Sequence, residues 1–408
     1  MTDVLIAGGG VMGLAIGWRL ARAGVDVTVL ERDGAECDRP TGAWWASAGM
    51  LAPLSEAGFD DPDALAFGRA SLALYPQFAA ELEADAGQSI GLRTEGTVIA
   101  AADRDEAVWL RRQWTYHQEL GLPTQWMSGD EAREREPHLG PRVPAALFAP
   151  TDHQVDSRLL GAALRRAFLA RGGTLRDGWE VARIDVEGGR ARGVWARPVA
   201  TLPGAEAGAP CGAAPGAGEG AAQAGEHRAA EERIAADRVL VCTGSWTRLL
   251  LADGETAAAA PRVRPVKGQL LALEMSPLLT LAHVVRTRRV YLVPRADGRL
   301  VIGATSEEAG FDMRMTAGGV LDLLRDAWEV LPGIYDLPLL QTWAGLRPVS
   351  RDGLPVLGAT PVEGLFLATG HGRNGILLTP ATAMAMAELL MTGTTPDAIL
   401  PFALSRFG

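Results

Sequence analysis

Apolar and polar residues alternate in a characteristic order over the first thirty residues. Residues 4–7 form a short apolar run typical of a buried strand. A glycine-rich turn follows, and a second apolar run over residues 25–30 ends at Glu31. Between the turn and that run, apolar residues recur at helical spacing, at Met12, Ala15, Ile16 and Leu20. This order predicts a strand, a helix and a second strand, the β–α–β unit of parallel sheets.

Further elements follow from the same patterns. Helical periodicity spans residues 63–86 and 157–170, and glycines at 172 and 173 end the second helix. Residues 96–101 predict a strand, and a charged helix follows it. Apolar runs at 238–246 and 364–369 predict buried strands, far downstream of the first unit. We therefore expect the first domain to be assembled from separate segments of the chain.

Strand patterns dominate the intervening regions. Residues 179–198 alternate about a Glu-Gly-Gly turn and predict a hairpin. Strand-like runs within 267–275, 283–305 and 337–358, with a turn at Asp297-Gly298, predict a mostly antiparallel sheet that also includes part of 90–101. A period of two in this sheet places Tyr291, Val293 and Arg295 on one face.

The predicted fold class is α/β, with a discontinuous Rossmann-like domain and an interleaved α+β domain on the antiparallel sheet. We expect residues 1–58, 151–258 and 341–408 in the first domain, and residues 59–150 and 259–340 in the second. Residues 198–230 are rich in Ala, Gly, Pro and Glu and offer little to bury, so they predict an extended surface loop.

Composition narrows the function classes. The chain has 408 residues, 48% apolar and 22% charged, and a net charge of −10, which disfavours a nucleic-acid-binding surface. The beginning of the chain lacks the pattern of a signal peptide, and no apolar run is long enough for a membrane span, so we expect a cytoplasmic protein. The three cysteines (Cys37, Cys211 and Cys242) and the scattered histidines predict no metal site.

The glycine-rich turn carries a chemical signal. In Gly8-x-Gly10-x-x-Gly13, the first glycine allows the turn, the second admits a pyrophosphate and the third allows close helix packing. Glu31, at the end of the second strand, suits the adenosine ribose and disfavours the additional phosphate of NADP. The fingerprint does not decide between FAD and NAD. The lack of a second fingerprint in the sequence and the downstream strands favour a flavin.

A second glycine-rich stretch, residues 370–380 (GHGRNGILLTP), follows the apolar run at 364–369. Glycines at 370, 372 and 375 let the backbone approach a ligand, and a helix N-terminus here stabilises negative charge. Thr379-Pro380 fits the first positions of that helix. For His371, a role in capping the turn is the alternative to ligand binding.

Five motifs in one order carry a family resemblance over nearly the whole chain, together with the N-terminal fingerprint. They are TGAWWASAGMLAP (41–53), VKGQLLAL (266–273), VYLVPRADGRLVIGAT (290–305), WAGLRPVSRDGLPVLG (343–358) and GHGRNGILLTPAT (370–382). The sequence resembles the D-amino-acid oxidase superfamily of FAD-dependent amine oxidoreductases, and within it the glycine oxidases. The first domain would then bind FAD non-covalently, and the second would cover the flavin ring.

The resemblance also implies site residues. Tyr291, Arg347 and Arg373 would hold the substrate; Arg347 could form a two-pronged carboxylate clamp, with an interdomain salt bridge as the alternative. Arg373 is either a second anchor or a brace of the flavin loop. The implied cofactor contacts are Gly8, Gly10, Val11, Met12 and Gly13 at the pyrophosphate, Glu31 and Arg32 at the adenosine, Ala43, Trp44, Ala48, Gly49 and Met50 along the flavin, Val181 at the adenine, Gly244, and His371, Gly372, Arg373, Asn374, Gly375, Ile376 and Leu377 at the pyrimidine end.

The implied reaction is oxidation of glycine, sarcosine or D-alanine. A hydride passes to flavin N5, the imine hydrolyses to an α-keto acid and ammonia, and dioxygen yields hydrogen peroxide. No proton-transfer residue is assigned. The expected setting is synthesis of the thiamine thiazole, the expected partners are the small substrate and dioxygen, and we expect a homo-oligomer.

The sequence departs from the family pattern at two places, and three alternative functions stay open. Gly372 stands where close relatives carry a bulky aromatic residue, and Trp44-Trp45 stands where relatives have small residues. A D-amino-acid or cyanide-forming glycine dehydrogenase subunit would pass electrons to a carrier. A tRNA-modifying flavin oxidase is disfavoured by the acidic charge. A non-catalytic flavin subunit is disfavoured by the complete set of Tyr291, Arg347 and Arg373.

Overall fold

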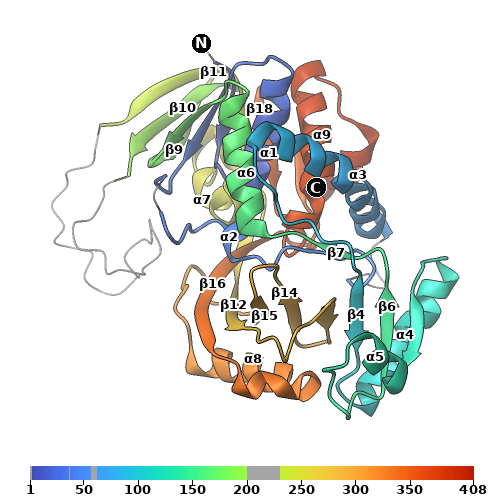
Figure 1. The fold of residues 1–408 in the computed structure, drawn as a ribbon. Helices are drawn as coiled ribbons and strands as arrows, with labels where there is room; N and C mark the ends of the chain where they lie inside the picture. The colour runs from blue at the N-terminus through green and yellow to red at the C-terminus, as the bar shows by residue number, and fades with distance from the viewer. Residues whose placement is uncertain (1, 36, 57–61, 200–229) are drawn as a thin grey trace.

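Two sheets organise the chain in the computed structural model: the first lies beside the long helices in the upper half of Figure 1, and the second lies in the lower half. The structure describes residues 2–35, 37–56, 62–199 and 230–408. The loop predicted at 198–230, with Cys211, lies almost wholly outside the described residues.

The first sheet has the order β17-β18-β11-β1-β2-β8, and every neighbouring pair is parallel except β17 with β18. The central strand, β1, pairs with one strand that is near in sequence, β2, and one that is distant, β11. Val4 lies opposite Val27 on one side and Arg238 on the other. The prediction of a discontinuous Rossmann-like domain is confirmed. The strands are β1 (Thr2–Ala7), β2 (Val27–Glu31), β8 (Thr174–Asp177), β11 (Glu232–Val241), β17 (Val356–Ala359) and β18 (Leu365–Thr369).

Both faces of this sheet are covered. Alternation along β1 turns Ile6 towards the helices and Leu5 towards the opposite face, where a hairpin continues from β11. The helices are α1 (Val11–Arg22), α3 (Pro62–Ala86), α6 (Ser157–Ala170) and α9 (Gly375–Thr392), and the hairpin strands are β9 (Trp179–Glu187) and β10 (Arg190–Pro198). Among the described helices, α9 alone is long and apolar enough for a membrane, but 72% of it is buried within the protein.

The second sheet has the order β16-β12-β15-β14-β13-β4-β6-β5 and is antiparallel except between β13 and β4, as predicted. Alternation along β14 sends Leu292 to the face covered by α8 and Val293 to the face that meets the first domain. The strands are β4 (Thr97–Ala100), β5 (Gln125–Ser128), β6 (Ala145–Ala149), β12 (Arg264–Glu274), β13 (Val284–Arg286), β14 (Tyr291–Pro294), β15 (Arg299–Gly303) and β16 (Leu339–Val349).

Short elements complete the chain. A small two-stranded sheet links the layers and consists of β3 (Met50–Leu51) and β7 (His153–Gln154). The remaining α-helices are α2 (Ala43–Ala46), α4 (Arg104–Glu119), α5 (Gly129–Arg135), α7 (Thr247–Leu250) and α8 (Ala317–Val330). The 3-10 turns are η1 (Gly244–Trp246), η2 (Gly254–Ala259), η3 (Pro332–Asp336), η4 (Asp397–Phe402) and η5 (Leu404–Phe407).

Two elements cross the expected division into five segments. Helix α3, expected in the second domain, packs in the helical layer of the first, where Tyr75 and Phe78 are buried. Strand β16 spans the expected boundary at 340/341 and pairs with β12 in the second sheet. The five segments remain a proposal, with α3 reassigned to the first domain and the last boundary moved to follow Val349.

The start of α9 differs from the local signal in the sequence. The helix begins at Gly375, so Thr379 and Pro380 lie inside it and do not cap it. Pro380 has no N–H for the carbonyl of Ile376, and Tyr75 Oη of α3 donates to that carbonyl at 2.6 Å instead. Ser71 Oγ donates to the carbonyl of Leu377 at 2.7 Å. Helix α3 thus replaces helical hydrogen bonds disturbed by the proline.

Tyr75→Phe is expected to lower the free energy of unfolding by about 1–3 kcal/mol, because the buried carbonyl of Ile376 loses its donor. Tyr335→Phe serves as the control, since that side chain is 83% exposed. Urea unfolding of the two variants measures the difference. Equal stabilities would contradict the proposed repair of α9.

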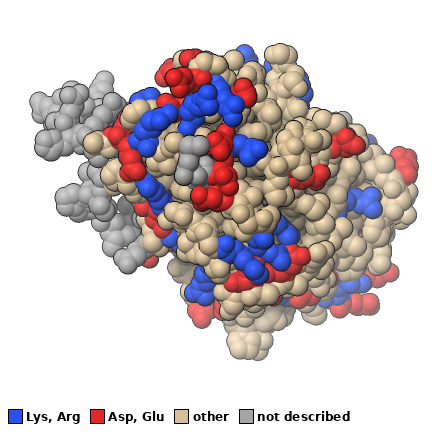
Figure 2. All heavy atoms as spheres, turned by 90° about the horizontal axis from the view of Figure 1, so that it is seen from above, with Lys and Arg blue, Asp and Glu red and all other residues tan. Residues whose placement is uncertain are grey.

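Charges of both signs are interleaved on the face seen in Figure 2. Ion pairs with this character include those of Arg19 and Arg22 with Glu81 in the helical layer. The face in Figure 2 therefore presents no continuous basic surface, and the expectation of no nucleic-acid partner stays a prediction.

Candidate active site

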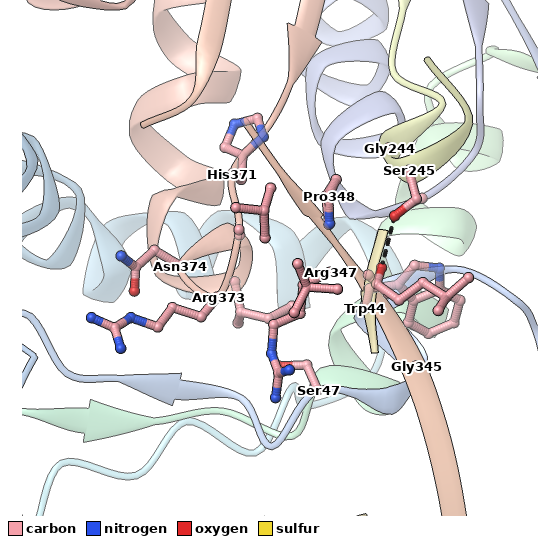
Figure 3. Close-up of a pocket in the computed structure, with 18 of the residues that line it drawn as sticks. Trp44, Ser47, Gly244, Ser245, Gly345, Arg347, Pro348, His371, Arg373 and Asn374 are labelled. Atoms are coloured by element: carbon pink, nitrogen blue, oxygen red, sulfur yellow. Dashed lines mark hydrogen bonds between the residues drawn. The ribbon is translucent and has the colours of Figure 1, made fainter. Parts of the chain in front are cut away.

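A cavity of about 1020 Å³ lies between the two sheets, at the carboxyl ends of β1, β2, β11 and β18 (Figure 3). Open α/β sheets bind ligands at this edge. Every residue predicted to contact cofactor or substrate lines the cavity except Gly13. Residues from the whole length of the chain, from Gly8 to Leu377, are therefore brought to one place.

The glycine turn after β1 is built for a close backbone approach. Gly8 has a φ of +103°, and a Cβ there would lie 2.7 Å from the carbonyl oxygen of Cys242. Gly13 does not line the cavity, and a Cβ there would lie 2.0 Å from the carbonyl oxygen of Gly8. Gly10 caps α1 without a side-chain hydrogen bond, so the N–H groups of the first turn are free for an anion.

Glu31 lies at the end of β2, beside this turn. Its carboxylate accepts hydrogen bonds from the N–H groups of Gly9 at 2.5 Å and Asp33 at 3.0 Å. Burial raises its pKa to about 7, and the charge of Asp33 adds to the shift. Arg32 extends over the ring of Trp246, 4.4 Å from its centroid, and donates to Thr41. This end of the cavity can accept hydroxyl donors and stack a flat ring.

The segment 43–50 is held by a buried arginine. Arg295 donates to the carbonyls of Ala48 at 2.6 Å and Val155 at 2.9 Å. Gly49 has a φ of +66°, and a Cβ there would lie 1.9 Å from Val155 O. Sequence reasoning placed Arg295 on the correct face but did not find this role. An arginine in a strand gives no local signal of a partner about 250 residues away.

The N-terminus of α9 opens onto the cavity. Asn374 caps the helix without a side-chain hydrogen bond, and the first turn holds no acidic residue. The His371 imidazole is buried with Nε2 3.3 Å from Thr382 Oγ1, and burial lowers its pKa to about 3. The ring is therefore neutral and engaged within the fold, which favours the structural alternative for this side chain.

Arg347 and Tyr291 lie together on the second sheet. Arg347 Nη1 donates to the carbonyl of Thr305 at 3.0 Å, and the guanidinium lies over Gly268, where a Cβ would be 2.5 Å away. Among the described residues, no carboxylate lies within 4.0 Å of Arg347. Burial raises the pKa of Tyr291, whereas the positive charge of the neighbouring Arg347 acts in the opposite direction. This half-buried cation has an adjacent hydroxyl group and no acidic partner among the described residues, so it suits a ligand carboxylate.

Arg373 has a different environment. Its Nε lies 3.0 Å from Glu56 Oε2, and its side chain is 59% exposed. Arg286 Nη2 lies 3.7 Å from the other oxygen of Glu56. Glu56 and Arg286 were not predicted, since neither forms part of a recognisable motif. Within the described residues, the structure thus separates Arg347, a cation without a carboxylate partner, from Arg373, which is already paired.

The geometry of the cavity fits a dinucleotide. At one end, the start of α1 has no side-chain cap and lies beside the Glu31 carboxylate, which can accept from hydroxyl groups. At the other end, the start of α9, which also has no side-chain cap, faces the antiparallel sheet. Residues 3–389 match the profile of the family DAO, FAD dependent oxidoreductase. The chain is 34% identical to a glycine oxidase of Geobacillus kaustophilus, over 99% of this chain and 97% of that protein.

A crystal structure of glycine oxidase from Geobacillus kaustophilus superposes with a TM-score of 0.84 over 99% of this chain and 98% of that one. A bifunctional protein ThiO/ThiG of Trichormus variabilis is 33% identical over 99% of this chain, which spans only 55% of that longer protein. The chain belongs to the D-amino-acid oxidase family of FAD-dependent oxidoreductases, and FAD is its cofactor.

Proposed function

We propose that this enzyme oxidises glycine, with sarcosine and D-alanine as alternative substrates, and uses dioxygen as electron acceptor. The observation that carries the proposal is the Arg347 guanidinium, which has a tyrosine hydroxyl beside it and no carboxylate partner in the described chain. It lies in the same cavity as the dinucleotide fingerprint. The similarity to a glycine oxidase and to a bifunctional ThiO/ThiG protein supports glycine as substrate and thiamine thiazole synthesis as the setting.

Substrate binding rests on Arg347 and Tyr291, which we propose hold the carboxylate and so fix the position of Cα. Bound FAD supplies the two-electron acceptor for the hydrogen on Cα. The free N–H groups at the start of α9 would stabilise negative charge on the acceptor. Ala46, Ala48 and Leu270 give the cavity an apolar wall between the sheets, which excludes water.

The roles left to solvent are proton exchange and hydrolysis. We assign no side chain to proton transfer, because a neutral amine needs no base to release its α-hydrogen as hydride. The imine formed from glycine hydrolyses to glyoxylate and ammonia, and dioxygen is reduced to hydrogen peroxide. Activity is expected to rise with pH until the substrate amine is neutral.

The direct test is anaerobic mixing of the yellow protein with glycine. We expect loss of the visible flavin absorbance and its recovery on admission of air. Acetate, which offers the carboxylate without the amine, is the control and is expected to leave the absorbance in place. Bleaching without recovery would support a dehydrogenase that uses a carrier. Bleaching only by a bulkier amine would contradict glycine as substrate.

Glu31 predicts a pH dependence of cofactor binding. Its pKa of about 7 lies above its ordinary value, so the folded FAD-free protein binds a proton there that the unfolded chain releases at lower pH. Because the folded protein holds this proton more tightly than the unfolded chain does, the free energy of unfolding of the FAD-free protein is expected to fall as pH rises from about 4.5 to 7. Ribose hydroxyls donate to the charged carboxylate, so FAD affinity is expected to rise over the same range.

Glu31→Gln is expected to remove both trends, because the amide does not titrate. Titration of the FAD-free protein with FAD, and its thermal unfolding, between pH 5 and 8 measure them. Glu274→Gln changes an exposed carboxylate and is the control. A pH profile of FAD affinity that Glu31→Gln leaves unchanged would show that another group is responsible.

A further inference from the structure

The indole of Trp44, on α2, lies in a slot formed by glycines from three elements. A Cβ on Gly161 would lie 2.3 Å from Trp44 Cζ3, and one on Gly42 would lie 2.5 Å from Nε1. A Cβ on Gly10 would lie 3.4 Å from Cδ1. The six-membered end of the indole therefore packs on α6, while its pyrrole edge lies beside the glycine turn at residues 8–13, the expected phosphate-binding turn.

Gly161 supports this placement independently of the ring. It lies inside α6, where glycine is among the least favourable residues because it loses the most backbone freedom on folding. Alanine would be the ordinary choice at this position, but its methyl group would collide with the indole. The absence of a side chain at Gly161 thus leaves the space on α6 that the Trp44 indole fills.

The Nε1–H group of Trp44 has no acceptor in the described part of the chain, although Trp18, Trp195 and Trp343 each donate to a protein oxygen. Although it has no partner among the described residues, this nitrogen is not buried. The side chain lines the cavity, so the N–H group faces the cavity. Beside it stands Gly10, the uncapped start of α1. Two kinds of free N–H donor therefore meet at one point.

We propose that Trp44 Nε1 donates a hydrogen bond to the pyrophosphate of FAD and acts with the first turn of α1 as its binding site. An indole N–H can donate a hydrogen bond but cannot accept one, which suits a phosphate oxygen. The N-terminus of a helix also favours anions. This assigns Trp44 to the pyrophosphate and not to the flavin ring. The inference rests on FAD as cofactor and does not depend on glycine as substrate.

The neighbouring Trp45 provides a matched control. Its ring stands 6.4 Å from that of Trp343, and Arg158 lies over it at 4.0 Å from the centroid. It does not line the cavity. Trp44→Phe and Trp45→Phe are therefore the same chemical change, made once beside the phosphate-binding turn and once within a packed cluster.

The test uses the full-length protein stripped of FAD and titrated with FAD, with ADP and with adenosine. Trp44→Phe is expected to raise the Kd for FAD and for ADP by about tenfold, as for loss of a hydrogen bond to a charged group, and to leave adenosine unchanged. Trp45→Phe is expected to leave all three unchanged. Unaltered ADP binding in Trp44→Phe, or equal losses for ADP and adenosine, would overturn the proposal.

A second measurement keeps the proposal testable if Trp44→Phe folds poorly. In protein labelled with ¹⁵N at the indole nitrogens, the Trp44 N–H resonance, assigned by its nuclear Overhauser contact with Gly42, is expected to move downfield on addition of ADP while that of Trp45 stays in place. A Trp44 resonance that does not respond to ADP would contradict the inference. A protein that shows this response yet ignores glycine would retain the inference and lose the proposed substrate.

Discussion

Arg347→Lys is expected to lose nearly as much activity as Arg347→Ala, with kcat/KM for glycine lowered roughly a hundredfold or more, equivalent to about 3 kcal/mol. One guanidinium nitrogen is already committed to the carbonyl of Thr305. The remaining N–H groups form the planar fork that matches a carboxylate, and lysine provides a charge without that geometry. Steady-state peroxide formation measures the effect, and an unchanged flavin spectrum shows that the cofactor site is intact.

Two companion variants separate a carboxylate clamp from a general effect of charge. Arg373→Lys is expected to be milder, because Arg373 is largely exposed and pairs with Glu56. Tyr291→Phe is expected to cost about 1 kcal/mol, the value of one hydrogen bond. If Arg347→Lys keeps most of the activity, Arg347 acts only as a nearby positive charge.

The sequence predicts best where function depends on short-range spacing. The turn from Gly8 to Gly13 and the carboxylate of Glu31 belong to one β–α–β unit, whose geometry is set within about thirty residues. The same holds for the β14–β15 turn at Asp297-Gly298, where Gly298 has a φ of +88°. Local backbone requirements leave a mark on residue type, and both features were predicted for that reason.

The contacts that hold the site together could not be predicted in this way. Tyr75 reaches the carbonyl of Ile376 and Arg295 reaches that of Ala48, across roughly 250 to 300 residues of chain. Thr379-Pro380 shows the converse failure, since its sequence fits a helix start but the helix begins earlier. Donors from α3 make an internal proline tolerable there, and tertiary structure overrides the local signal.

Gly13→Ala is expected to be strongly damaging to the cofactor domain, although it adds a single methyl group. The new Cβ would lie 2.0 Å from the carbonyl oxygen of Gly8, which is backbone and has no side chain to rotate away. Helix α1 and the phosphate-binding turn would have to separate. Overpacking of this kind costs about 1–3 kcal/mol of stability. FAD affinity should fall further, by more than tenfold, because the free N–H groups of α1 would leave their position.

Gly318→Ala makes the same change in α8, where a Cβ would meet nothing within 4 Å. There the substitution should stabilise the protein by about 0.5–1 kcal/mol, since alanine is the better helix former and restricts the unfolded chain. Urea unfolding and FAD titration of both variants give the comparison. A similar stabilisation at both positions would mean that α1 can move away from the turn without cost. In that case close packing at Gly13 would not be what positions the helix for the pyrophosphate.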